Sequence, residues 1–233
     1  MGLAQGPIAE EEERAADSPL VASIRRVRYR ACTCETVLPD GSWDLLFMRH
    51  AGGPMVVVQT GQIVAPLQAE HQAGDEMLVV AFKPEVYLPR LPGHKTFQQG
   101  VARPVEHDRS FWIDADRLEV PSFDNVEQLV AAMARKGLIE RDPVVARALQ
   151  GNSLRLDERS IQRHFAAVTG LSFKGFQQIA RAREAADLLR SGRSLSQVAA
   201  ELGFSDQSHM THSLKRFLGQ TPAQLARQAV VRA

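Results

Sequence analysis

The sequence predicts an α+β protein of two domains, in which a small β-barrel or cupin-like domain precedes an all-helical domain. Three observations carry this prediction. Short apolar runs separated by turn-forming residues fill the first half of the chain. From Val126 onward the apolar residues recur at intervals of three and four, as in amphipathic helices. In the last third, one helix–stop–helix pattern occurs twice, at an offset of 49 residues.

The β-rich domain is predicted over residues 19–122. Its apolar runs DLLFM, MVVVQTGQIV and MLVVAF are separated by DG, GG and AGD, which are typical of antiparallel strands and their turns. The preceding residues 1–18 are acidic and lack the basic-then-apolar order of a secretory signal. This segment is predicted to be a disordered tail. No run of about 18 apolar residues occurs, so no membrane span is expected.

Helical spacing begins in residues 123–141, which are predicted to form a helical connector. Asp142 and Pro143 then have the pattern of an N-cap followed by proline at the first helical position. They open the helix PVVARALQG, and a helical domain is predicted over residues 142–233.

The repeated pattern defines two copies of one helical unit. Asp157 and Asp206 are the expected N-caps, and Gly170 and Gly219 are the expected C-terminal stops. Other positions also match at the same offset: Ile161 with Met210, Phe165 with Leu214, Ser172 with Thr221, and Phe176 with Leu225. The sequence therefore predicts the same supersecondary unit twice.

Each copy has the pattern of a helix-turn-helix. In the second copy, Ser194 can cap a short helix that stops at Gly203, and a tight connection leads to the helix after Asp206. In this motif the second helix enters the major groove of DNA. The predicted buried stripe of that helix consists of Met210, Ser213, Leu214 and Phe217, which leaves polar and cationic residues on the opposite side.

The charge distribution agrees with a nucleic-acid module at the C-terminus. Residues 157–233 contain 11 Lys and Arg against 6 Asp and Glu, a net charge of +5, although the whole chain has only +1. In the first copy, Arg159, Gln162, Arg163 and Ala166 are predicted to face outward. Arginine can bond guanine through O6 and N7, and glutamine can bond adenine through N6 and N7.

The segment SLSQVAAELGFSDQSHMTHSLKRFLGQTP resembles the C-terminal signature of the AraC/XylS family of bacterial transcription regulators. The preceding GLSFKGFQQIARAREAADLL resembles the helix that links the two helix-turn-helix units of that family, and the resemblance covers residues 142–228. It implies DNA contacts at Arg159, Gln162, Arg163, Gln207, Ser208, His209, Thr211, His212 and Lys215. Met210 and Leu214 replace aromatic residues of the family, and His212 replaces an arginine.

The resemblance implies a cytoplasmic transcription regulator without enzymatic activity, whose partner is double-stranded DNA and not a membrane. A small-molecule effector, RNA polymerase and a second copy of the chain are the further partners that the resemblance allows. The sequence leaves open the effector, the operator, the choice between activation and repression, and the oligomeric state.

The segment LPDGSWDLLF (38–47) resembles the start of a compact β sensor domain in one AraC-type subgroup. Such domains bind an effector, mediate dimerisation, or both. Large aromatic side chains, several of which also carry a polar tip, are the candidates for an effector pocket. They are Trp43, His71, Phe82, His94, Phe97 and Trp112.

Four other residue patterns bear on chemistries besides DNA binding. Cys32 and Cys34 are either small buried strand residues or a pair that binds a soft metal or senses oxidants. His209 and His212 lack a cysteine or carboxylate partner on their face, so no metal or other cofactor is predicted. An Ada-like repair protein would need a four-cysteine zinc site or a PCHR acceptor motif, and a cupin metal enzyme would need an HxH pair, but the chain has only Glu70-His71.

Overall fold

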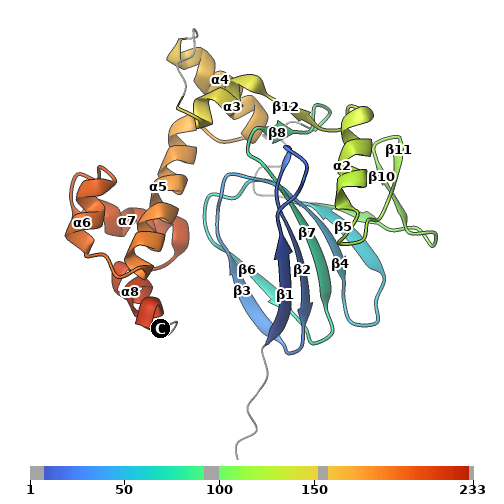
Figure 1. Cartoon of the computed structure of the whole chain (residues 1–233), viewed down its shortest axis with the longest axis horizontal. Helices are drawn as coiled ribbons and strands as arrows, with labels where there is room; N and C mark the ends of the chain where they lie inside the picture. The colour runs from blue at the N-terminus through green and yellow to red at the C-terminus, as the bar shows by residue number, and fades with distance from the viewer. Residues whose placement is uncertain (1–7, 92–99, 152–156, 231–233) are drawn as a thin grey trace, which may run out of the picture.

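A sheet-rich N-terminal half precedes an all-helical C-terminal part in the computed structural model, which describes residues 8–91, 100–151 and 157–230 (Figure 1). The predicted order of a β domain and a helical domain is therefore confirmed. The main sheet is built from β1 (Ala9–Arg14), β2 (Val21–Tyr29), β4 (Asp44–Arg49), β5 (Met55–Gln59), β7 (Glu76–Phe82) and β9 (Val101–Pro104). Three two-stranded pairs complete the strands: β3 (Thr33–Val37) with β6 (Leu67–His71), β8 (Val86–Tyr87) with β12 (Glu140–Arg141), and β10 (Ser110–Ile113) with β11 (Asp116–Glu119).

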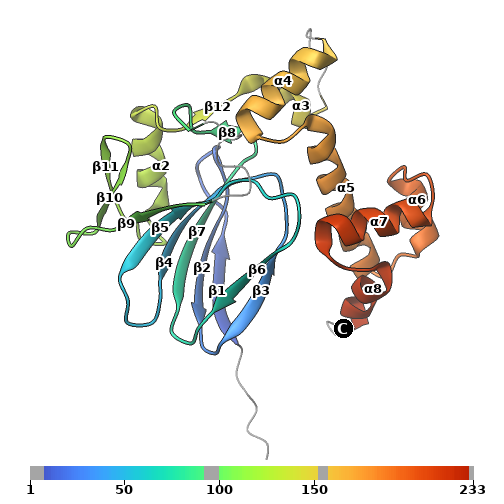
Figure 2. The same cartoon turned by 180° about the vertical axis from the view of Figure 1, so that it is seen from behind.

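The main sheet is open. Its strands follow the order β1-β2-β7-β4-β5-β9, every neighbouring pair is antiparallel, and β1 and β9 are its two edges. The arrangement is thus cupin-like, and among the strands that the structure describes the closed barrel, which is the other expectation, does not form. The two-stranded sheet of β3 and β6 lies on one side of this sheet, opposite the side that carries helix α2 (Val126–Arg135) (Figures 1 and 2).

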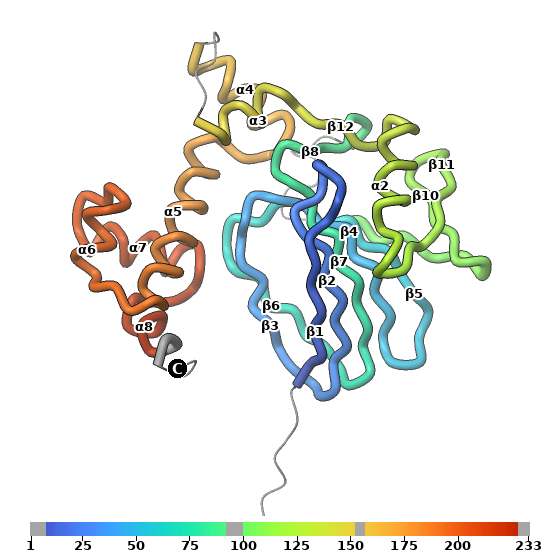
Figure 3. Tube along the Cα trace, viewed as in Figure 1, coloured from blue at the N-terminus to red at the C-terminus, as the bar shows by residue number. Residues whose placement is uncertain are grey.

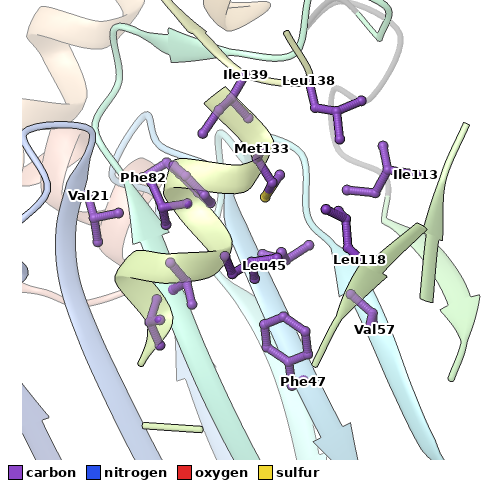
Figure 4. Packing of buried hydrophobic residues seen from close by; sticks show 14 of the residues in the cluster. Val21, Leu45, Phe47, Val57, Phe82, Ile113, Leu118, Met133, Leu138 and Ile139 are labelled. Atoms are coloured by element: carbon purple, nitrogen blue, oxygen red, sulfur yellow. The ribbon is translucent and has the colours of Figure 1, made fainter. Parts of the chain in front are cut away.

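The larger hydrophobic core lies between the main sheet and α2. Leu45 and Phe47 of the sheet pack there with Met133 of α2 and with Ile113 and Leu118 of the β10–β11 hairpin (Figure 4). The apolar residues that repeat at helical spacing in 123–141 are thus part of the sheet's own core. This segment is therefore not a bare connector, because it covers one face of the β domain.

The acidic N-terminal segment forms strand β1, which corrects the prediction of a disordered tail for residues 9–14. Residues 1–7 lie outside the described part of the chain. The reason for the strand is charge pairing, because four consecutive glutamates lie opposite an arginine-rich strand. Two ion pairs join the two strands, Glu11 with Arg25 and Glu12 with Arg26, and a third joins Glu10 to Arg30 directly after β2.

At the end of β1, Arg14 joins the sheet to α2. Its guanidinium donates to both carboxylate oxygens of Glu127, at 2.6 and 2.9 Å, and to the carbonyl oxygen of Phe123. The hydrogen bond from Arg14 lowers the pKa of Glu127 from 4.5 to about 2. Both side chains are about one quarter exposed, so solvent screens part of this attraction.

The variant Glu127→Gln is expected to lower the free energy of unfolding by about 1 kcal/mol at pH 7. Because folding depresses the pKa of Glu127, its contribution is complete above pH 4.5 and is lost as the pH falls through about 2. Urea unfolding of both proteins between pH 7 and pH 2 tests this, with the exposed Glu119→Gln as the control. A difference that stays constant down to pH 2 would contradict the ion pair as its cause.

The cysteine pair is exposed, which corrects the alternative of small buried residues. Cys32 precedes β3, and Cys34 lies within β3, where its thiol donates to Oε1 of Gln68 at 3.1 Å. In the part of the chain that the structure describes, no three His, Cys, Asp or Glu side chains are grouped so that they could hold a metal ion.

The helical part contains α3 (Pro143–Leu149), α4 (Glu158–Thr169), α5 (Phe173–Arg190), α6 (Leu195–Glu201), α7 (Gln207–Leu218) and α8 (Pro222–Val230). The path of the chain leads from the α3–α4 pair along α5 to the group of α6, α7 and α8 (Figure 3). Ile179, Ala182 and Leu189 of α5 form one core with Met210 and Leu214 of α7.

Residues of the β domain contact the helical part directly. The turn before β4 lies against α5, where Arg183 donates to the carbonyl oxygen of Pro39 at 3.3 Å. At Gly41 a side chain would overlap the ring of Phe176. Leu38 and Val64 pack against the core of α5 and α7. The segment LPDG, which begins the predicted sensor-domain motif, is therefore part of the interface between the two halves.

Candidate nucleic-acid interface

The first predicted reading helix is α4, and its ends are those that the repeat indicates. Asp157 accepts a hydrogen bond from the backbone N–H of Ser160 at 2.8 Å, and Gly170 ends the helix with a φ of 74°. Hydrogen bonds from the hydroxyl and the backbone of Ser160 hold the pKa of Asp157 below its usual value. Phe165 and Val168 are buried against α3. The structure leaves Arg159, Gln162 and Arg163 exposed.

The second predicted reading helix, α7, has the same length and the same caps. Asp206 accepts from the backbone N–H of His209 at 2.7 Å, which lowers the pKa of Asp206, and Gly219 ends the helix. Met210, Leu214 and Phe217 are buried. The opposite side is accessible: Gln207, Ser208, His209, His212 and Lys215 are exposed, and Thr211 is partly exposed.

Helix α5 connects the two units and holds them apart. Its 18 residues form one continuous helix about 27 Å long. The α3–α4 pair lies at its beginning, and α6 and α7 pack along its second half (Figures 1 and 2). The chain thus presents two polar, cationic helix faces that are separated by a rigid spacer.

The turn of the second unit is supported from α5. The guanidinium of Arg181 lies over the ring of Phe204, 5.2 Å from its centroid, and donates to the carbonyl oxygen of Gly203 at 3.4 Å. The ring of Phe204 in turn meets the imidazole of His209 edge-on, with centroids 5.4 Å apart. Arg181 therefore fixes the turn that positions the first residues of α7.

Arg181→Met is expected to weaken DNA binding about fivefold, because the cation–π contact and the hydrogen bond are worth about 1 kcal/mol together. Arg181→Lys should recover part of this loss, since lysine keeps the charge but not the planar group. Electrophoretic mobility shift measures the affinity. The exposed Arg227→Met of α8 is the matched control, and an equal loss in that control would show that only net charge matters.

Of the predicted effector residues that the structure describes, only Trp43 and Phe82 lie together, and they do so inside the core. Trp43 stacks on Phe82 at 4.1 Å within the core under α2, and its indole N–H donates to the carbonyl oxygen of Val86. His71 instead stacks on Tyr29 at 3.9 Å, in a separate cluster. Trp112 is 44% exposed on β10. His94 and Phe97 lie outside the described residues.

A groove of about 720 Å³ lies elsewhere on the β domain, and no residue pattern indicated it. It forms where β1 pairs with β2 and where residues 120–123 cross the sheet, so only long-range pairing creates it. Its apolar lining includes Phe47, Met55, Leu78, Val120, Pro121 and Phe123, and its charged lining includes Glu10, Glu12, Arg26, Arg28 and Glu76.

Comparison with protein families finds one match in the helical part. The model of a family described as "Helix-turn-helix domain" matches residues 151–228. Two curated relatives are HTH-type transcriptional regulators. The chain is 38% identical to RipA of Corynebacterium diphtheriae over 68 residues, which are 29% of this chain and 20% of RipA. It is 32% identical to VirS of Mycobacterium tuberculosis over 105 residues, which are 45% of this chain and 30% of VirS.

The alignments therefore span less than a third of each of these relatives. Among solved structures, ToxT from Vibrio cholerae is similar with a TM-score of 0.45 and 9% sequence identity. The similarity covers 96% of this chain and 100% of ToxT, whose crystal structure contains a bound methylnaphthalenyl butenoic acid. Within the described residues, no helix combines the length and the hydropathy that crossing a membrane would require.

Proposed function

We propose that the chain is an AraC-type transcription regulator that reads double-stranded DNA with both of its helix-turn-helix units, and the match of residues 151–228 to the helix-turn-helix family supports this. The observation that carries the proposal is the duplicated helix. Helices α4 and α7 have equal lengths, the same type of cap at each end, and an exposed polar face with cationic side chains. A polar and cationic face on a single helix would be an ordinary solvated surface. Two helices with matching faces and caps favour a shared binding role.

The separation of the two helices supports simultaneous binding. Successive major grooves on one face of B-DNA lie about 34 Å apart. A spacer helix of about 27 Å, with a reading helix packed beside each end, has the dimensions for adjacent grooves. In this proposal Arg159, Gln162 and Arg163 contact bases from α4. Gln207, Ser208, His209, Thr211 and His212 contact bases from α7, and Lys215 lies nearer the phosphates.

The β domain would modulate this binding. We propose a division into a β domain that ends with β12 and a DNA-binding domain over residues 142–233, within a cytoplasmic protein that catalyses no reaction. The groove of about 720 Å³ has the volume of a small-molecule site, which favours it over the scattered aromatic residues as the effector site. A second copy and RNA polymerase are the protein partners that this role would involve.

The double variant Arg163→Ala, His212→Ala tests the proposal. A bidentate base contact contributes about 1–3 kcal/mol, so loss of one side chain from each reading helix should weaken binding to a selected duplex at least about 30-fold. The matched control, Arg227→Ala with His107→Ala, removes the same residue types from exposed positions outside both helices. Fluorescence anisotropy measures both. Unchanged affinity and selectivity in the double variant would show that these helices do not read DNA.

A further inference from the structure

His212 stands where arginine is common in the AraC/XylS family. Its N–H group is already hydrogen-bonded within α7. Its Nδ1 lies 2.9 Å from the carbonyl oxygen of Ser208, one helical turn earlier. A carbonyl oxygen can only accept, so Nδ1 must carry the proton and donate it. In the neutral ring the other nitrogen, Nε2, then has a free lone pair. Within the part of the chain described, Nε2 has no partner, and the side chain is exposed.

The neighbouring Thr211 likewise presents an acceptor because its donor is used within the helix. Its hydroxyl donates to the carbonyl oxygen of Gln207 at 2.8 Å, again four residues earlier. The proton of the hydroxyl is therefore used within the helix, and its oxygen can act only as an acceptor toward other groups. Two adjacent side chains of α7 thus offer acceptors because the helix backbone binds their donors.

The two arginines on the exposed face of α4 offer donors instead. Arg159 and Arg163 are exposed, and a guanidinium has five N–H donors and no acceptor. Such side chains match the O6 and N7 acceptors of guanine in the major groove. The two arginines of α4 and the Thr211–His212 pair of α7 therefore differ in hydrogen-bond polarity, although the two helices have the same length and caps.

We propose that α7 recognises an exocyclic amino group in the major groove, N4 of cytosine or N6 of adenine, through Nε2 of His212, while α4 recognises guanine. The inference rests on the proposed function, since it assumes that α7 lies in the groove. Guanine is disfavoured opposite His212 because its major-groove edge has only acceptors. The other tautomer would place the lone pair of Nδ1 against the oxygen of Ser208 at 2.9 Å. The backbone thus fixes which base edge the imidazole can read.

The experiment selects duplexes from a randomised pool with the full chain at pH 8. We expect adenine or cytosine at one position of the α7 half-site, and we expect His212→Arg to select guanine there. The amino group is then removed alone, with deoxynebularine in place of adenine or a 2-pyrimidinone nucleoside in place of cytosine. The wild type should bind the modified duplex about tenfold more weakly.

His212→Ala identifies the side chain responsible. It should bind the unmodified duplex about tenfold more weakly than the wild type and should show no further loss on the modified duplex. Circular dichroism checks its folding, and His212→Gln, whose amide oxygen also accepts, should keep most of the sensitivity to the amino group. Thr211→Val, which keeps the shape and removes the hydroxyl, tests the second acceptor in the same way.

The outcomes separate the inference from the proposed function. If the wild type selects guanine at the position that changes with His212, or if removal of the amino group leaves its affinity unchanged, the inference is overturned while DNA reading stands. If no sequence is selected from the pool and every duplex is bound equally weakly, the proposed function is overturned, and the inference with it.

Discussion

Replacing Leu214 with alanine is expected to lower the free energy of unfolding of the helical domain by about 2–5 kcal/mol, the range for large-to-small changes in a packed core. Leu214 is fully buried in the core that α7 shares with α5. The cavity would lie directly beneath the exposed face of α7. Specific DNA binding should therefore be lost together with stability, since the orientation of α7 depends on this packing.

Thermal unfolding followed by circular dichroism and binding to a selected duplex measure the two effects. Lys215→Ala, at the next and exposed position, is the control. We expect it to weaken binding through the lost charge and to leave the unfolding transition unchanged. A Leu214→Ala protein that unfolds and binds like the wild type would mean that α7 does not pack on α5 as described.

Gly41→Val is expected to separate the β domain from α5. Gly41 has a φ of 78°, where a side chain costs about 1–2 kcal/mol, and a Cβ atom there would overlap the ring of Phe176. That ring cannot easily move, because it packs against Phe165 with centroids 5.4 Å apart. The free energy of unfolding should therefore fall by more than the backbone strain alone. The variant should also expose the junction between the domains to protease.

Gly52→Val isolates the contact from the backbone strain. Gly52 has nearly the same φ, 70°, but a Cβ atom there would have no neighbour within 4 Å. We expect this control to lose stability through strain alone and to resist limited proteolysis like the wild type. Equal melting temperatures and equal cleavage in the two variants would argue that the contact between Gly41 and Phe176 does not hold the domains together.

Features that depend on near neighbours in the chain could be predicted from the sequence. Asp157 and Asp206 cap their helices because the side chain bonds an N–H three residues ahead, and such a signal is fully contained in a few residues. The same holds for the buried stripe of α7. The predicted contacts of its exposed face with bases stay a prediction, because exposure alone does not determine a partner.

Features that depend on distant pairing could not be predicted. The glutamates of β1 suggest disorder until they are aligned with the arginines of β2, and that register is a tertiary property. The same limit explains the scattered aromatic residues. A strand alternates between two faces, but its sequence does not say which face α2 will cover. Trp43 and His71 therefore look alike in the sequence although they lie in different clusters.

If both units read DNA as proposed, the continuous helix α5 sets the relative orientation of the two half-sites of the operator as well as their separation. In an α-helix each residue adds a rise of about 1.5 Å along the axis and a rotation of about 100° around it. One residue inserted into Phe173–Arg190 would hardly change the separation of α4 and α7, yet it would turn one of them away from its groove. The relative phase of the two half-sites along the duplex is thus encoded in the length of this helix. Promoters whose half-sites are shifted by a few base pairs should be excluded by orientation.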